Sequence, residues 1–167
     1  MALSPVTLLR EQIARADSLL TQVFANVTTE QLVWLPAGGM TNSIGSTFLH
    51  LYYIEDRLIH RLIGDKPTVF DANGWQARLG YDPAKQWTPL SNPDPAVLRA
   101  YAAEVGVETT SYLEGLAPEE LEREITTPRG QSPLYATLSL TLVIHKFTHL
   151  GEISGLLGCQ GVTGFPF

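Results

Sequence analysis

Residues 134–157 read LYATLSLTLVIHKFTHLGEISGLL, and the organisation of the chain follows from this stretch. Its apolar residues recur at helical spacing, which predicts a helix of roughly 25 residues, about 37 Å long. His145 and His149 are four residues apart, so on a helix they lie one above the other on the same face. Glu152 falls on that face as well. One helix therefore directs three side chains that bind metals or move protons to the same side.

Length and composition indicate a single globular domain over residues 1–167, long enough to bury a real core. No apolar run reaches the roughly 20 residues that a membrane-spanning helix needs. The first residues lack a basic segment followed by an apolar core, so no secretory signal is expected. The single cysteine, Cys159, cannot form an internal disulfide, which fits a reducing cytoplasm. A lone cysteine of this kind is expected to be a small buried hydrophobic residue.

The charge balance disfavours nucleic acid and membrane surfaces as partners. The formal net charge is -6 and the isoelectric point is about 5.1. No run of lysine or arginine is present that would bind phosphate backbones or anionic lipid surfaces.

Capping residues and glycines divide the chain into helices. Three starts are marked by a capping side chain followed by proline, at Ser4-Pro5, Asp94-Pro95 and Ser132-Pro133. Glycines at 64, 115 and 158 mark three ends. Together with the apolar spacing, these signals predict four long helices, over about residues 5–26, 42–63, 95–114 and 133–157. Four long amphipathic helices with one long connection are typical of an all-α four-helix bundle.

The connection over residues 64–93 is rich in proline, glycine, aspartate and asparagine, yet it carries four aromatic residues: Phe70, Trp75, Tyr81 and Trp87. This composition predicts a loop that packs onto the body, and a loop of this length is usually functional. Short turns of helix are expected over 28–32 and 117–121, and an extended piece over 124–128. No stretch shows convincing strand alternation.

A third histidine, His50, is predicted to lie on the second helix, beside its buried stripe. If it meets His145 and His149 in the bundle interior, three imidazoles form a site of the kind that holds catalytic zinc, with one position open. Imidazole also suits nickel, iron and copper. His60 lies near the end of the same helix, where a cation suits the helix dipole, so a surface or capping role is expected for it.

Two sharper metal motifs are excluded. A zincin requires glutamate directly after the first histidine, where this chain has Lys146. A di-iron carboxylate bundle requires Glu-x-x-His pairs, and the chain has none. Several roles remain open for Glu152: a fourth ligand, a general base, a partner that orients an imidazole, or an exposed residue at the helix end.

The chain resembles the DinB/YfiT-like superfamily of metal-dependent enzymes. The matching segments are residues 42–51, NSIGSTFLHL, with Glu55 beyond them, and residues 145–153, HKFTHLGEI, followed by a glycine-rich tail. The order of the elements also fits over nearly the whole chain. The resemblance implies a four-helix bundle, a divalent metal held by His50, His145 and His149, and frequent homodimers. At Glu152 the chain departs from the superfamily, which often has glutamine there.

The resemblance further implies zinc, nickel or manganese as the metal. It also implies thiol-dependent S-transferase activity with bacillithiol, or maleylpyruvate isomerase activity with mycothiol. The leading hypothesis is thus a metal-dependent enzyme acting on a small molecule, either a thiol-dependent S-transferase or an enzyme with hydrolase-like chemistry. Glu152 would then handle a proton, and aromatic residues such as Trp75, Trp34 and Phe167 would shape the pocket. The alternatives are a non-catalytic, structural metal-binding bundle, and a metal-free bundle with hydrogen-bonded histidines.

Overall fold

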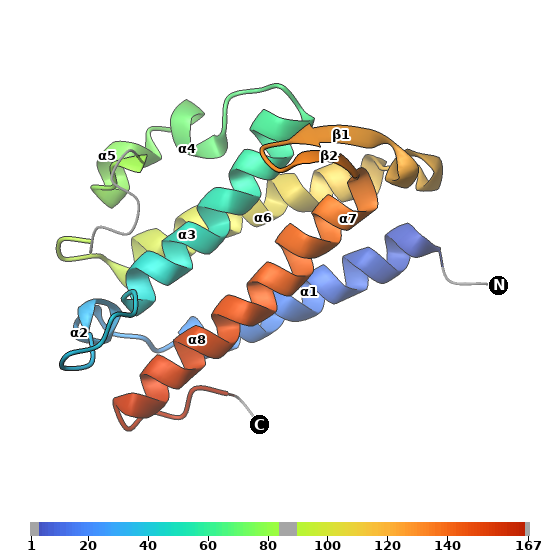
Figure 1. The fold of residues 1–167 in the computed structure, drawn as a ribbon. Coiled ribbons are helices and arrows are strands. Elements are labelled where there is room, and N and C mark those ends of the chain that lie inside the picture. The colour runs from blue at the N-terminus through green and yellow to red at the C-terminus, as the bar shows by residue number, and fades with distance from the viewer. Residues whose placement is uncertain (1–3, 84–89, 166–167) are drawn as a thin grey trace.

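The computed structural model describes residues 4–83 and 90–165, and it is a bundle of four long helical arms (Figure 1). Two arms are continuous α-helices and two contain a π-helical segment. The continuous arms are α1 (Pro5–Phe24) and α6 (Pro95–Gly115). The other arms are α3 (Ile44–Asp56) with η1 (Arg57–Ile63), and α7 (Leu134–Leu138) with η4 (Ser139–Ile144) and α8 (His145–Cys159). The predicted four-helix bundle is confirmed.

Capping side chains set most of the helix starts. Ser43 accepts a hydrogen bond from the Ser46 amide at the start of α3, and Asp94 accepts one from the Ala96 amide at the start of α6. Thr28 forms a reciprocal capping box with Gln31 at the short helix α2 (Thr29–Val33). These caps satisfy amides that have no partner within the helix.

The last arm begins and ends differently from the prediction. Ser132 is not a helix cap: it lies in strand β2 (Gly130–Pro133), which pairs antiparallel with β1 (Glu124–Thr127) after the 3₁₀ segment η3 (Pro118–Glu122). The extended piece at 124–128 is thus confirmed, but its partner strand was missed, because the short polar sequence GQSP shows no alternation.

At its C-terminal end, α8 passes Gly158 and ends at Cys159, two residues before Gly161. The Gly161 residue has a φ of 75°, and the amide of Val162 bonds the carbonyl of Leu157. This is a Schellman motif, in which the residue after the C-cap adopts a left-handed backbone conformation. Glycine adopts that conformation more readily than other residues do. Cys159 therefore remains helical, and it is exposed. The prediction that it is buried is wrong, because this last turn directs position 159 away from the core.

The π-helical segment η4 keeps the last arm in phase with the core. Buried positions recur every four residues along it, at 134, 138, 142, 146 and 150. In a regular α-helix each four-residue step advances about 40° around the axis, so this series would rotate out of the core within a few steps. A π-helical turn is wider and contains more than four residues, so a four-residue step advances less than one full turn. This reverses part of the rotation that accumulates in the α-helical turns. All five side chains consequently stay buried.

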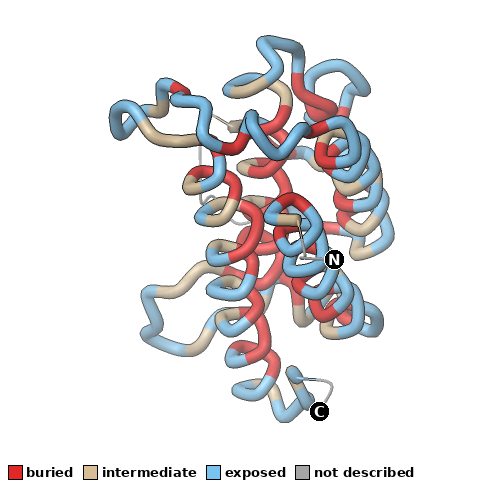
Figure 2. The backbone as a smooth tube through the Cα atoms, turned by 90° about the vertical axis from the view of Figure 1, so that its right-hand side faces the viewer, coloured by how far each residue is buried: buried red, intermediate tan, exposed pale blue. Residues whose placement is uncertain are grey.

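Two adjoining clusters of buried side chains form the core, and Figure 2 shows the buried positions on the inner sides of the long helices. In one cluster the rings of Phe24 and Phe48 stack with centroids 3.7 Å apart. The other lies toward the hairpin and includes Leu113, Leu134 and Leu138. The three histidines lie on the arms that border the first cluster.

The connection after α3 packs onto the bundle, as predicted, and forms helices α4 (Val69–Ala72) and α5 (Trp75–Leu79). Phe70, Trp75 and Tyr81 are buried, whereas Trp87 lies outside the described residues. The buried carboxylate of Asp56 holds this segment, because it accepts the amides of Val69 and Phe70, each at 2.9 Å. It also accepts the Tyr101 hydroxyl at 2.9 Å.

Removing the Asp56 carboxylate is expected to destabilise the protein. Asp56→Ala leaves two buried amides and one hydroxyl without their acceptor, so the free energy of unfolding should fall by about 3 kcal/mol or more. Urea unfolding followed by circular dichroism measures this change. The control Asp71→Ala removes an exposed carboxylate of the same segment and should cost less than about 1 kcal/mol. Equal losses in the two variants would contradict the assigned role.

Candidate metal centre

The bundle brings the three predicted histidines together. His50 comes from α3, and His145 and His149 come from the first turns of α8. The Nε2 atom of His145 lies 3.3 Å from Nε2 of His50 and 3.0 Å from Nε2 of His149. One ligand atom from each of the three side chains lies within 4.8 Å of the others. Residues 95 positions apart in the chain therefore present their nitrogens to one point.

The spacing of these nitrogens fits a metal ion. Two nitrogens bound to one zinc ion at 2.0–2.1 Å, at angles of about 90–110°, lie about 2.8–3.4 Å apart. The measured separations of 3.0 and 3.3 Å fall within this range. The three histidines could therefore hold a metal ion without a large rearrangement.

Glu152 fixes the orientation of one imidazole. Its Oε2 atom lies 2.8 Å from Nδ1 of His149, and its Oε1 atom accepts the Thr41 hydroxyl at 3.4 Å. A neutral histidine that donates its Nδ1 proton to the carboxylate keeps Nε2 as a bare acceptor. This is the pattern by which a carboxylate orients a metal ligand. Of the roles left open for Glu152, the contacts match that of an orienting partner.

The environment keeps two of the imidazoles neutral. Burial, with a contribution from the nearby His149, lowers the pKa of His50 to about 4. Burial likewise lowers the pKa of His145 to about 4, with contributions from His149 and His50. Near pH 7 both rings therefore carry lone pairs, and the neutral imidazole is the form that binds metals.

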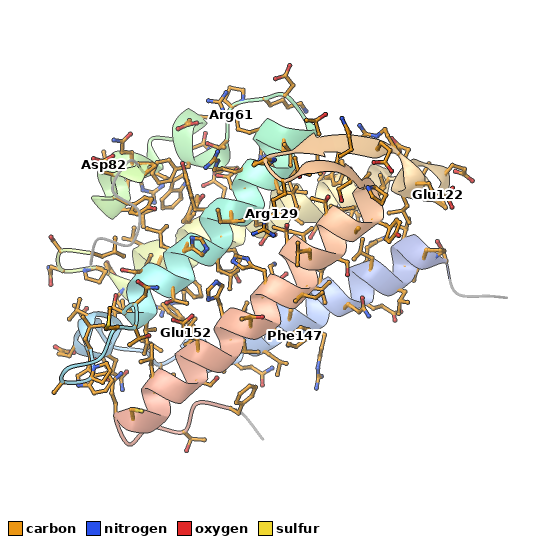
Figure 3. The ribbon with its side chains drawn as sticks, in the orientation of Figure 1. Arg61, Asp82, Glu122, Arg129, Phe147 and Glu152 are labelled. Atoms are coloured by element: carbon orange, nitrogen blue, oxygen red, sulfur yellow. The ribbon has the colours of Figure 1, made fainter. Side chains whose placement is uncertain are left out.

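The site is partly open to solvent. All three histidines are half-buried, and the side chains of His149 and Glu152 are 14% and 28% exposed. Figure 3 shows Glu152 on the side of α8 that faces α3. A ligand from solution can therefore approach the histidine nitrogens from the exposed side. A metal ion held by these three histidines could keep a further coordination position on the exposed side.

Directly beside His145, the buried Lys146 joins three helical arms. Its Nζ atom lies 2.8 Å from Oε2 of Glu55 on α3 and 2.6 Å from Oδ1 of Asp17 on α1. Burial acts to lower the pKa of Lys146, but the two carboxylates outweigh it and raise that pKa above its usual range. The side chain is thus a charged group enclosed in the bundle. In the sequence, Lys146 served only to exclude a zincin motif, and its burial was not predicted.

The other predicted residues lie apart from the histidine cluster. His60 contacts Asp56, with Nδ1 2.9 Å from Oδ1, and lies 3.7 Å from Glu108, so it joins η1 to α6. Its side chain is largely buried, which corrects the expectation of a surface role. Trp75 is a core residue whose indole donates to Glu104 at 2.8 Å. A hollow of about 600 Å³ is lined by eight residues between Phe70 and Asp82, and none of the three histidines lines it.

Of the remaining aromatic residues proposed for a pocket, Trp34 packs against the core, and Phe167 lies outside the described residues. The contact of Thr41 with Glu152 had no signal in the sequence, because a lone threonine in a loop matches no motif. Glu55 belonged to the segment that carried the family resemblance, but its partner Lys146 could be identified only from the fold.

Neutralising Lys146 is expected to destabilise the bundle. Lys146→Met keeps the length of the side chain but leaves Glu55 buried without a counter-charge, so the free energy of unfolding should fall by about 3–5 kcal/mol. Adding Glu55→Leu to this variant should recover part of the loss. Chemical denaturation checks both, with Lys66→Met at an exposed lysine as the control, which should change stability by less than about 0.5 kcal/mol. A loss below 1 kcal/mol in Lys146→Met would refute the role.

Of the helices in the described ranges, none has the length and hydropathy that a bilayer span requires. No curated protein matches the chain. Seven chains of solved structures match it. One is a crystal structure of a conserved protein from Enterococcus faecalis, with a TM-score of 0.74 over 94% of this chain and 99% of that chain. At 16% sequence identity, this likeness establishes the fold alone.

The family comparison agrees with the bundle. The model of the DinB superfamily matches residues 12–153, which include His50, His145, His149 and Glu152. The matched range includes all or part of each of the four helical arms. The chain belongs to the DinB superfamily.

Proposed function

We propose that the protein binds one divalent transition metal through His50, His145 and His149 and acts on a small molecule as a metal-dependent enzyme. The convergence of the three Nε2 atoms, with separations of 3.0 and 3.3 Å, supports this proposal. Three neutral nitrogen donors suit zinc or nickel better than manganese, which prefers oxygen ligands. The chemistry would be thiol-dependent S-transfer, with a low-molecular-weight thiol as co-substrate, or hydrolysis.

When bound at such a site, a divalent metal lowers the pKa of a water molecule or a thiol in its open position. The chain supplies the remaining requirements. His50 and His145 offer neutral nitrogens, and Glu152 holds His149 with its Nε2 free. Because Glu152 is partly exposed, its carboxylate can also exchange a proton with solvent or substrate. We further propose that the protein works as a homodimer, as the family resemblance implies.

The metal content of the protein tests the proposal. Untagged protein purified without chelator should contain one equivalent of a single transition metal, and His50→Ala and His149→Ala should each lose it, because two imidazoles hold a metal far more weakly than three. His60→Ala is the matched control, since it removes a histidine outside the cluster and should keep the metal. Elemental analysis by mass spectrometry gives the stoichiometry. Full metal content in His149→Ala, or no uptake of added zinc, nickel or manganese by the wild type, would refute the site.

The role of Glu152 has a separate test. Glu152→Ala frees the His149 ring to rotate, so the metal affinity should fall about 10- to 100-fold. Glu152→Gln keeps a hydrogen-bond acceptor and should lose less. Competition with a chromophoric chelator measures both affinities. Unchanged affinity in Glu152→Ala would show that the carboxylate does not support the metal ligands.

A structural role for the metal is the alternative, because the ligands come from α3 and α8 and a bound ion would tie these helices together. The two functions differ in what metal removal does. A structural ion should raise the thermal unfolding midpoint by many degrees and exclude solvent from its coordination sphere. An enzyme site should keep an exchangeable water, detected by water-proton relaxation after substitution with a paramagnetic divalent metal.

A further inference from the structure

The outward side of the last helical arm is free of charge. Its exposed residues between 140 and 158 are Leu140, Ile144, Phe147, Thr148, Gly151, Gly155 and Gly158, and none is ionisable. The three bulky apolar side chains are substantially exposed, with Ile144 at 54%. The other long helices differ: α1 exposes Arg10, Glu11 and Arg15. We call Leu140, Ile144, Phe147, Gly151, Gly155 and Gly158 the outer face.

Within the outer face, the bulky residues and the glycines are separated by position. Leu140, Ile144 and Phe147 occupy the N-terminal half, and the three glycines occupy the C-terminal half. A Cβ atom added at any of these glycines meets no atom within 4 Å, so packing within the described residues does not require glycine there. Glycine in the interior of a helix makes the helix less stable than alanine does. Three glycines in one helix therefore need a reason outside the single chain.

A second copy of the chain provides that reason. If two outer faces pack antiparallel about a two-fold axis level with the peptide between His149 and Leu150, each bulky side chain of one copy lies over a glycine of the other. The opposed pairs are Leu140 with Gly158, Ile144 with Gly155, and Phe147 with Gly151. Parallel packing would instead set bulky residues against bulky residues and leave the glycines facing each other. The order of residues thus fits one pairing, and that pairing is self-complementary, as a two-fold interface requires.

We propose that the protein dimerises through this outer face, with α8 packed antiparallel on α8 of a second copy. The inference rests on the homodimer of the proposed function and assigns its interface. The histidines lie on a different side of α8 from the exposed outer face, and Figure 3 shows Glu152 and Phe147 on different sides of the helix. The pairing therefore leaves both metal centres accessible.

The size of the outer face sets the expected strength of the dimer. The face is about 27 Å long, and a helix about 11 Å across covers roughly 300 Å² per copy, or about 600 Å² in total. This is smaller than a stable specific interface, so the contact belongs to the weak, transient class. Exposed Tyr135 at the start of the same arm extends the apolar surface. A dimer that dissociates on dilution is expected, rather than one that is permanent.

Sedimentation velocity over a concentration series tests the interface in the full chain. The wild type should change from a species of 18.3 kDa to one of twice that mass as the concentration rises. Ile144→Glu places a charge against the partner helix, and Gly155→Leu fills the space opposite it, so each should raise the dissociation constant at least about a hundredfold. The matched controls on α6, Val107→Glu and Gly106→Leu, alter an exposed valine and a glycine with open space and should dimerise like the wild type.

The orientation has its own measurement, because the single exposed cysteine lies near one end of the outer face. Spin labels on Cys159 of the two copies should be separated by about 30 Å in the antiparallel pairing, since each lies about ten residues from the two-fold axis. Parallel pairing would place them within about 15 Å. Double electron–electron resonance distinguishes the two.

The outcomes separate this interface from the rest of the proposed function. A monomer at every concentration would overturn both the homodimer and the interface. A dimer that persists in Ile144→Glu and Gly155→Leu, or a short distance between the Cys159 labels, would overturn the interface alone. Metal content measured on monomeric Gly155→Leu reports on the histidine site independently, because this substitution changes none of its residues.

Discussion

The ion pair that Lys146 forms inside the bundle is the contact on which the rest of the structure depends. Its ammonium group has no solvent exposure, so it must keep both carboxylate partners to offset the cost of burial. Glu55 and Asp17 come from two different helices, which leaves α8 one rotation in which the charges meet. The next residue along α8 in the N-terminal direction is His145. Satisfying the charge therefore also turns the histidines toward α3.

The same solution recurs at the next residue of α3, Asp56. Asp56 is buried and fully hydrogen-bonded, and it holds the segment containing α4 and α5 through backbone amides. Each of the two buried carboxylates of α3 thus fixes the position of a neighbouring element, which is one way in which buried charge makes a fold specific. Between them and the cap at Ser43 lies His50. The candidate metal centre is consequently built on a helix whose neighbours are fixed by directional contacts and not by apolar packing alone.

The sequence was sufficient for the helices and for the set of histidines, because caps, glycines and apolar spacing are local signals. Prediction from the sequence failed for features that depend on contacts between residues far apart in the chain. Strand β2 exists because it pairs with β1, and the burial of Lys146 depends on partners 91 and 129 residues away. The regular four-residue spacing from Leu134 to Leu150 contained the signal for a π-helical segment, since no straight α-helix keeps such a series on one face. Cys159 was predicted to be buried because free cysteines usually are. Its position on the last turn of α8 instead exposes it.

The distribution of the ligands along the chain has a consequence for how the protein folds. His145 and His149 are neighbours as soon as one helical turn forms, but His50 is 95 residues away. An unfolded or partly folded chain therefore offers at most a two-nitrogen site, and the third nitrogen arrives only when α3 docks on α8. Tight metal capture would thus mark the completion of tertiary structure. In a cell, metal would be withheld from nascent chains and acquired by those that have already passed their final folding barrier.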